Sequence, residues 1–268
     1  MHPTRALLLR SVLEVERKFT PTQPLRSALD SQSLISDRMH LTFASIEYKG
    51  RSRLLDKYYD TPHSSLSRQG IWLRYRVPGF GPGRWECKVR QGGSYAKAKF
   101  EELQTKSEIE KLLKEVVAVD CSGYEQKLDK EMLRDEDTSL NLCPLGFKET
   151  MTIDCSRQSW ILDNEFNLVI DLCTFGHQVG EVELTTVVET EGNDSAEHAE
   201  ARKQAAQHLD RRIMAFMEKH QWAFVKDDEP VGKLSAYLKW MEDNYVSPML
   251  EYSMRQQLIC ATGLRPGG

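Results

Sequence analysis

The segment Leu13–Phe19 reads Leu-Glu-Val-Glu-Arg-Lys-Phe, and in it the apolar Leu13, Val15 and Phe19 alternate with the charged Glu14, Glu16 and Lys18. Such alternation is typical of a β-strand that has one apolar face and one polar face. The polar face would carry Glu14, Glu16 and Lys18, because residues two apart on a strand point to the same side, roughly 7 Å apart. The segment therefore predicts a strand that presents two carboxylates and an ammonium group to one side.

Further segments show the same alternation: residues 71–77, 84–90, 168–173 and 181–185. Several of their charged residues recur two apart with the same sign. The carboxylates are Glu181 with Glu183, plus Asp171, and the cations are Arg74 with Arg76 and Lys88 with Arg90. The charges of unlike sign are thus largely sorted onto different predicted strands.

For any one of these strands, the ordinary interpretation is a charged face in contact with water. The joint pattern weakens that interpretation. If the charged faces turn inward on a closed barrel, a cluster of carboxylates would face a cluster of cations inside it. Such a cluster is costly to bury without a ligand. A polyphosphate completes both halves, since Mg²⁺ or Mn²⁺ would join its oxygens to the carboxylates while arginines and lysines bind the remaining phosphate oxygens.

Seven segments, taken in order, form a specific set. They are 14–19, Tyr-Tyr-Asp-Thr-Pro at 58–62, Trp-Leu-Arg-Tyr-Arg at 72–76, Trp-Glu-Cys-Lys at 85–88, Arg-Gln-Ser-Trp at 157–160, Val-Gly-Glu-Val-Glu at 179–183 and Lys-Leu-Ser-Ala-Tyr-Leu at 233–238. From about Leu13 to Tyr245, the chain resembles the triphosphate tunnel metalloenzymes, also called the CYTH superfamily. The pieces at 58–62 and 233–238 are most similar to the animal-type thiamine triphosphatases of that superfamily.

The resemblance implies an α+β fold, namely a closed antiparallel eight-stranded β-barrel (the triphosphate tunnel) with flanking helices. It also implies Mg²⁺-dependent removal of the terminal phosphate from an organic triphosphate, first among them thiamine triphosphate, with Mn²⁺ as a substitute metal. By position, the metal ligands would be Glu14, Glu16, Asp171, Glu181 and Glu183. The phosphates would contact Lys18, Arg74, Arg76, Lys88, Arg157, Glu181 and Lys233. Lys88 and Tyr58 would be the catalytic residues.

The chain departs from the family pattern at Asp171-Leu172-Cys173, where the family has Asp-x-Asp. One acidic group is lost, which keeps open a polyphosphate-binding module without catalysis. Hydrolysis of inorganic triphosphate or of nucleoside triphosphates is a further alternative. Adenylyl cyclases also occur in the superfamily, but nothing in this sequence marks one. Glu102, or its neighbour Glu101, would match a further carboxylate of the tunnel.

Some of these residues also have a purely structural interpretation. Tyr58 could equally be a core hydroxyl, and Lys233 a solvated lysine at a helix start. Trp72 and Trp85 could stack against an organic ring, although packing in a core is the commoner role of a strand tryptophan. His177 is interpreted as a loop residue and not as a ligand.

Composition limits the function classes. The chain has 268 residues, with 36 Lys and Arg against 40 Asp and Glu, for a formal charge of −4. This near-balance argues against general binding to nucleic acid or membranes, which would need a basic excess. No apolar run is long enough to span a bilayer. The six cysteines form no Cys-x-x-Cys pair, which predicts reduced thiols and neither zinc nor disulfides. We expect a cytoplasmic monomer.

The chain is expected to form one interwoven domain over residues 12–246, after a flexible lead-in at 1–11. Residues 120–141 are charged and poorly periodic, which predicts a surface insertion. Residues 247–268 are expected to form a C-terminal helix and a flexible tail. Apolar spacing predicts four helices. One includes residues 109–117, and a longer one begins near Asp194 or Ser195 with a capping box. The last two span about 233–245 and 248–258.

Overall fold

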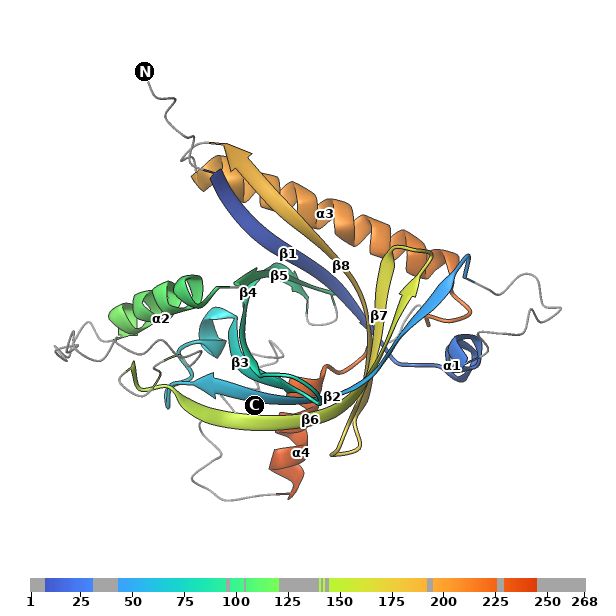
Figure 1. Cartoon of the computed structure of the whole chain (residues 1–268), viewed down its shortest axis with the longest axis horizontal. Helices are drawn as coiled ribbons and strands as arrows, with labels where there is room; N and C mark the ends of the chain where they lie inside the picture. The colour runs from blue at the N-terminus through green and yellow to red at the C-terminus, as the bar shows by residue number, and fades with distance from the viewer. Residues whose placement is uncertain are drawn as a thin grey trace, which may run out of the picture.

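The computed structural model describes residues 8–30, 43–94, 97–103, 105–120, 140, 142, 145–191, 195–225 and 229–244. Eight antiparallel strands close into a barrel in the order β1-β5-β4-β3-β2-β6-β7-β8 (Figure 1). Their bounds are β1 Leu8–Phe19, β2 Ile46–Asp60, β3 Ile71–Pro78, β4 Arg84–Ser94, β5 Lys97–Leu103, β6 Lys148–Leu162, β7 Phe166–Cys173 and β8 Gln178–Glu191. The predicted eight-stranded barrel is confirmed. Strand β1 begins at Leu8, inside the stretch predicted as a lead-in.

The described residues include four helices: α1 Gln23–Asp30, α2 Lys106–Asp120, α3 Ser195–Lys219 and α4 Lys233–Asn244. Helices α1, α2 and α3 lie outside the ring of strands (Figure 1), whereas Leu238 of α4 packs against Cys155 and Cys173, on the strand faces that also carry Arg157 and Asp171. A short 3-10 turn, η1 Ser67–Gln69, precedes β3. The predicted helices at 109–117, from Ser195 and from Lys233 are confirmed. The expected cap at Asp194, the helix at 248–258 and nearly all of the 120–141 insertion lie outside the described residues.

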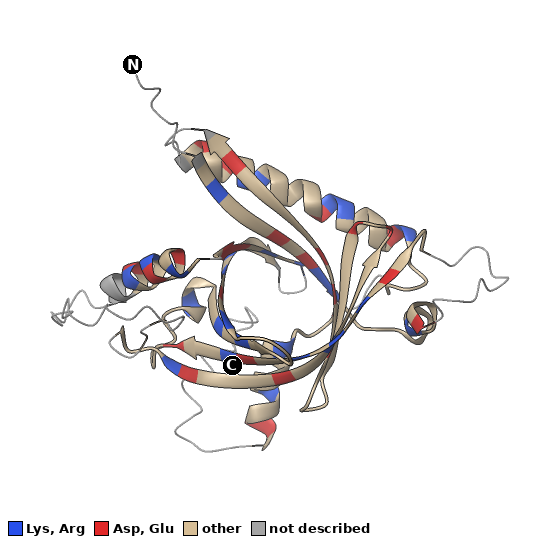
Figure 2. Cartoon of the chain, in the orientation of Figure 1, with Lys and Arg blue, Asp and Glu red and all other residues tan. Residues whose placement is uncertain are grey.

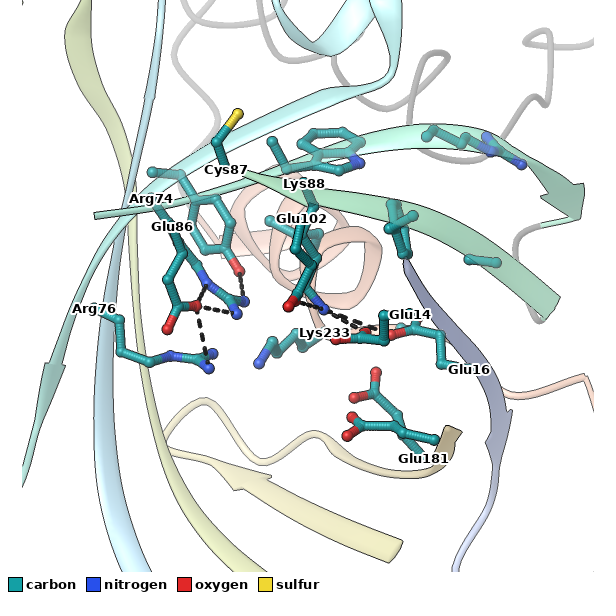
Figure 3. Close-up of a pocket in the computed structure, with 18 of the residues that line it drawn as sticks. Glu14, Glu16, Arg74, Arg76, Glu86, Cys87, Lys88, Glu102, Glu181 and Lys233 are labelled. Atoms are coloured by element: carbon teal, nitrogen blue, oxygen red, sulfur yellow. Dashed lines mark hydrogen bonds and ion pairs between the residues drawn. The ribbon is translucent and has the colours of Figure 1, made fainter. Parts of the chain in front are cut away.

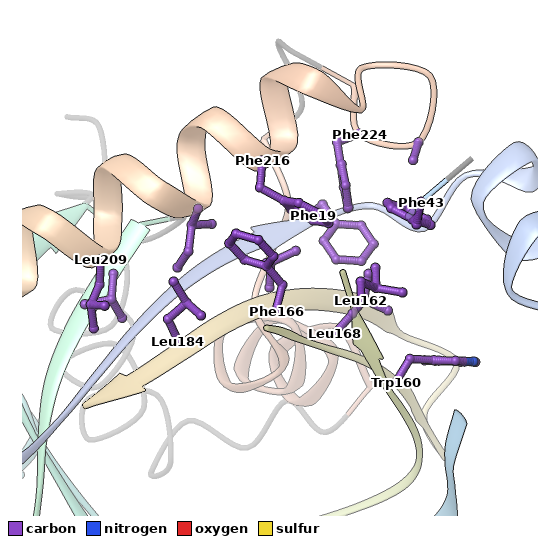
Figure 4. Close-up of a cluster of buried hydrophobic side chains, with 14 of the residues drawn as sticks. Phe19, Phe43, Trp160, Leu162, Phe166, Leu168, Leu184, Leu209, Phe216 and Phe224 are labelled. Atoms are coloured by element: carbon purple, nitrogen blue, oxygen red, sulfur yellow. The ribbon is translucent and has the colours of Figure 1, made fainter. Parts of the chain in front are cut away.

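Helix α3 covers β1 and β8 from the outside (Figure 1). Leu13, Val15 and Phe19 of β1 are each 1% exposed and belong to one apolar cluster with Ile213 and Phe216 of α3 (Figure 4). Because successive strand residues face opposite sides, covering the apolar face from outside leaves Glu14, Glu16 and Lys18 on the inside of the barrel, whereas Arg17 lies on the outer face and pairs with Asp210 of α3. The cluster thereby fixes which face of β1 lines the interior.

Gly180 on β8 is required by this packing. It lies opposite Phe19 in the strand register, and a Cβ atom at Gly180 would be 2.2 Å from the Phe19 ring. The glycine of the Val-Gly-Glu-Val-Glu segment therefore admits an aromatic ring beside the backbone. Two smaller apolar clusters complete the core, one that includes Ile109 and Leu113 of α2 and one that includes Leu238 of α4.

Cys155 and Cys173 form a disulfide between β6 and β7, where they are directly paired in the register. The prediction of reduced thiols is wrong for this pair. Sequence spacing could not reveal it, because the two cysteines are 18 residues apart and meet only through strand pairing. Cys87 is a free, buried cysteine, and burial raises the pKa of its thiol to about 12. Cys173 is therefore part of the barrel wall.

Ile213→Ala tests how far the barrel depends on α3. Ile213 is fully buried between the helix and the strands, so its truncation leaves a cavity and should lower the free energy of unfolding by about 2–5 kcal/mol. The measurement is urea denaturation followed by circular dichroism. Met214→Ala, on the same helix but 38% exposed, is the control and should change stability by less than about 1 kcal/mol. Equal losses in both variants would contradict the assigned packing.

Candidate functional site

Charged residues recur along the strands of the ring (Figure 2). The strands enclose a cavity of about 500 Å³, lined by many of these residues (Figure 3). Its lining includes the predicted cations Lys18, Arg74, Arg76, Lys88, Arg157 and Lys233, the predicted carboxylates Glu14, Glu16, Glu181 and Glu183, and Tyr58. The structure thus gathers in one place residues that lie up to 219 positions apart, from Glu14 to Lys233. Of the predicted site residues, Asp171 alone is outside this lining. Their roles stay predictions.

Three carboxylates converge on one side of the cavity. Glu14, Glu16 and Glu183 each offer an oxygen within 4.8 Å of the other two. Burial, together with Glu14 and Glu181 nearby, raises the pKa of Glu183 to about 8. Asn167 donates a hydrogen bond of 2.6 Å to Glu183. Carboxylate oxygens are the donors that hard divalent cations prefer, so this trio could hold a metal ion, and a cation there would offset the mutual repulsion of the acids.

Two lysines border the trio. Lys88 donates to Glu14 at 2.5 Å and lies 3.4 Å from Glu102. Burial opposes its charge, but Glu14 and Glu16 outweigh that effect and hold the pKa of Lys88 above its usual value. Lys18 pairs with Glu16 and, at 3.2 Å, with Glu181. Glu102 therefore faces the tunnel beside Lys88, whereas Glu101 pairs with Arg202 of α3.

The arginines of β3 form a second charged group (Figure 3). Arg76 donates two hydrogen bonds to Asp56, of 2.6 and 2.7 Å. Arg74 donates two to Glu86, of 2.8 and 2.6 Å, and lies 3.5 Å from the Tyr58 hydroxyl. Burial disfavours the charge on Glu86, but Arg74 and Arg76 prevail and lower its pKa to about 2. Both arginines line the cavity.

Asp171 lies among cations and not in the trio of carboxylates. It accepts two hydrogen bonds from Arg157, of 2.6 and 2.7 Å, and one of 3.0 Å from Lys233. Arg157 also lies 3.7 Å from Glu181. Burial opposes the charge on Glu181, but Lys18, Lys233 and Arg157 lower its pKa to about 2. Asp171 and Glu181 thus orient cations in this structure, and their role as metal ligands stays a prediction.

Aromatic residues complete the lining. Trp72 lines the cavity and packs against a buried cluster, and Phe100 lies under Lys88, whose Nζ is 5.4 Å from the ring centroid. The Trp85 ring lies 4.9 and 5.1 Å from Tyr59 and Tyr75 and packs with the α2 cluster. Trp85 therefore packs with the core but also borders the cavity, and stacking against an organic ring stays a prediction. His177 lies in the turn between β7 and β8, 2.7 Å from the Val231 carbonyl.

Sequence reasoning missed two charged residues of this region, Asp56 and Glu86. Asp56 is two positions before Tyr58, on the same face of β2, and pairs directly with Arg76 in the register. Glu86 shares a strand face with Lys88 and pairs with Arg74. The period of two could have placed both inside the barrel, but which cations they meet depends on the strand register, which the sequence does not state.

The CYTH domain profile matches residues 13–213. This chain belongs to the CYTH domain family. Among curated proteins, thiamine-triphosphatase of Homo sapiens is 29% identical over 194 residues, which cover 69% of this chain and 73% of that protein. Thiamine-triphosphatase of Macaca fascicularis is 29% identical over 265 residues, covering 95% and 96%.

Solved structures were matched as well. A putative adenylate cyclase from Vibrio parahaemolyticus matches with 14% identity, 81% coverage of this chain and 94% of its own, and a TM-score of 0.41. A putative adenylyl cyclase from Hippeastrum, reported with a dominant triphosphatase activity, matches with 12% identity, coverages of 89% and 98%, and a TM-score of 0.44. None of the described helices of this CYTH domain is long and apolar enough to cross a membrane.

Glu86→Gln tests the ion pairs of this CYTH domain by their pH dependence. The pKa of Glu86 is about 2 in the fold against an ordinary 4.5, so its stabilisation is present above pH 4.5 and is lost as pH falls towards 2. Glu86→Gln should be less stable than the wild type at pH 7, by on the order of 1–3 kcal/mol, and the gap should narrow between pH 5 and 3. Urea denaturation at each pH measures it.

Glu47→Gln serves as the control for this prediction. Glu47 forms an exposed pair with Lys49 at 2.8 Å on β2, and exposed pairs contribute only about 0–1 kcal/mol. Its effect should be small at every pH. A stability gap for Glu86→Gln that stays constant from pH 7 to 3 would contradict the charge pairing assigned to Glu86.

Proposed function

We propose that this CYTH domain protein is a Mg²⁺-dependent hydrolase that releases the terminal phosphate of an organic triphosphate, thiamine triphosphate to thiamine diphosphate first among the candidates. The observation that carries the proposal is the cavity of about 500 Å³ in which a trio of carboxylates and a group of arginines and lysines are gathered. The relatives named thiamine-triphosphatase support the choice of organic group.

The charge inside the barrel supports a requirement for divalent metal. The lining cations are Lys18, Arg74, Arg76, Arg84, Lys88, Arg90, Arg157 and Lys233, and the lining carboxylates are Glu14, Glu16, Glu86, Glu102, Glu181 and Glu183. When Asp56 and Asp171 behind the described lining are counted, acids equal cations in number. With all of these groups ionised, a polyphosphate would meet no net positive charge without added cations, and a metal ion beside Glu183, whose pKa is raised to about 8, would favour the ionised form of that acid. Mg²⁺, with Mn²⁺ as a substitute, prefers carboxylate and phosphate oxygens.

Different residues would bind the metal ion and the phosphate oxygens of the substrate. Glu14, Glu16 and Glu183 would hold the metal, which neutralises charge on the phosphoryl group when bound. Arg74, Arg76, Arg157, Lys18 and Lys233 would bind the non-bridging oxygens of the phosphates, arginines as forks and lysines as point charges. Glu181 lies between Lys18 and Arg157 and would orient both. Asp171 would do the same for Arg157 and Lys233.

Lys88 and Tyr58 are proposed to act nearest the chemistry. A water molecule attacks the terminal phosphorus in line, and the bond from that phosphorus to the bridging oxygen breaks, which yields phosphate and the diphosphate. Lys88 has a raised pKa and stays protonated, so it stabilises negative charge instead of acting as a base. The Tyr58 hydroxyl, 3.5 Å from Arg74, can donate a hydrogen bond to the leaving oxygen. We further propose that the protein acts as a monomer.

The apolar part of the lining favours an organic triphosphate over an inorganic one. Trp72, Phe100, Leu103 and Leu234 line the same cavity as the charged residues. Apolar and aromatic surface gains from contact with a heterocycle but offers nothing to a bare polyphosphate. Inorganic triphosphate, nucleoside triphosphates and binding without catalysis remain as alternatives to be separated by experiment.

A substrate panel tests the proposal. Phosphate release should be fastest with thiamine triphosphate and slower with tripolyphosphate and ATP. It should require Mg²⁺ or Mn²⁺: the activity should be lost when a chelator removes the metal and should recover fully when Mg²⁺ is added back. Initial rates at fixed enzyme concentration measure this. A wide advantage for tripolyphosphate or ATP would transfer the assignment to those substrates. Tight binding of tripolyphosphate without phosphate release over hours would instead identify a binding module.

Glu16→Gln tests the carboxylate trio. The amide keeps the shape of the side chain but is a poor metal ligand, so phosphate release at saturating Mg²⁺ should fall by at least about 100-fold, the size expected for a lost ligand or its equivalent. The melting temperature should change little. Glu189→Gln, an exposed β8 carboxylate that pairs with Arg10, should keep the wild-type rate. Normal metal-dependent turnover by Glu16→Gln would refute the assigned metal site.

A further inference from the structure

Asp56 is a buried carboxylate outside the described lining of the cavity. It lies on β2, is 2% exposed and faces Arg76 across the β2–β3 register. It therefore cannot contact a substrate without displacing the side chains in front of it. Nothing in the proposed chemistry uses it, yet a buried charge is retained only at a cost unless it is fully paired.

Three cations of the cavity contact Asp56. Arg76 binds it with both Nε and Nη2, at 2.6 and 2.7 Å, Nη1 of Arg74 lies 3.6 Å away, and Nζ of Lys233 lies 3.5 Å away. These cations come from β3 and from the first residue of α4. Burial opposes the charge on Asp56, but these three neighbours hold its pKa well below the usual range.

No other carboxylate of the described residues is paired with all three of these cations. Glu86 pairs with the two arginines and with Arg84, and Asp171 pairs with Lys233 and Arg157. Asp56 thus joins the β3 arginines to the α4 lysine at one point. Because β2 is hydrogen-bonded to β3 on one side and to β6 on the other, that point is held rigidly.

We propose that Asp56 is a positioning residue for the triphosphate clamp: its carboxylate holds Arg76, Arg74 and Lys233 at the spacing that fits neighbouring phosphate oxygens. The inference rests on the proposed function. Without Asp56, each flexible cation would have to be ordered when the substrate binds, and that loss of conformational freedom would weaken binding.

Two physical effects of removing Asp56 have opposite signs, which makes the proposal testable. Asp56→Asn removes one negative charge beside the cavity, so electrostatics alone predicts tighter binding of a polyanion. Loss of positioning predicts weaker binding. The expected result is an increase of tenfold or more in both the tripolyphosphate Kd, measured by calorimetry with Mg²⁺, and the KM of the hydrolysed substrate, with a smaller change in kcat.

Asp154→Asn is the matched control. Asp154 lies on β6 and is paired with Arg53 through several hydrogen bonds, but Arg53 is 70% exposed and on the outer surface. This variant also removes one negative charge and breaks a similar carboxylate–arginine pair, but it leaves Arg76, Arg74 and Lys233 in place. It should bind tripolyphosphate within about twofold of the wild type.

Two further variants separate positioning from damage to the fold. Asp56→Glu keeps the charge and moves the carboxylate by one methylene group, and it should still raise the Kd severalfold. If Asp56→Asn fails to fold, Asp56→Glu decides the question. In a double-mutant cycle with Arg76→Lys, the Kd penalty of the Asp56 variant should be much smaller when the Arg76→Lys substitution is already present, since the effect acts through Arg76.

The outcomes distinguish this inference from the proposed function. If the wild type hydrolyses the substrate and the Asp56 variants bind tripolyphosphate as tightly as the wild type or more tightly, the positioning role alone is overturned. Binding by the wild type without hydrolysis overturns the hydrolase, while the Kd comparison still decides the role of Asp56. A wild type that neither binds nor hydrolyses any triphosphate overturns both. A lower melting temperature for Asp56→Asn with unchanged Kd and KM would reduce Asp56 to a stabilising residue.

Discussion

Pairing of unlike charges inside a closed barrel is the constraint on which the rest of the structure depends. Arg76 with Asp56 and Arg157 with Asp171 are bidentate pairs whose carboxylates are almost completely buried. Such charges are tolerated only when each meets a partner in good geometry. The barrel supplies that geometry, because strand pairing fixes the position of every inward side chain relative to its neighbours.

The helices contribute by deciding which way each strand faces. Apolar residues of β1 and β8 are buried under α3, so the opposite faces of the same strands must line the interior. Helix α4 adds a charge to the interior, since its first residue, Lys233, lines the cavity and pairs with Asp56 and Asp171. The stability of the outer apolar layer and the arrangement of the inner charged layer are therefore coupled by the alternation of the strands.

The inner layer has two chemically distinct parts. Glu14, Glu16 and Glu183 bring three acidic groups within 4.8 Å of one another, whereas Asp56, Asp171 and Glu86 each have several cations around them. The first part is suited to a divalent cation and the second holds arginines and lysines in fixed positions. A single sign of charge along the interior would bind either metal or phosphate, and the division into two parts suits a complex of both.

The period of two in Leu13–Phe19 and in the other charged strands predicted which side chains share a face. The resemblance of the ordered segments to the CYTH superfamily predicted the barrel and most of the residues that line it. The helix of 195–219 followed from apolar spacing. Sequence alone could not tell that Asp171 faces Arg157 and Lys233 instead of the carboxylate trio, that Asp56 joins three cations, or that Cys155 meets Cys173. Alternation determines which side of a strand a residue occupies, but strand register and barrel closure decide which residue it meets there.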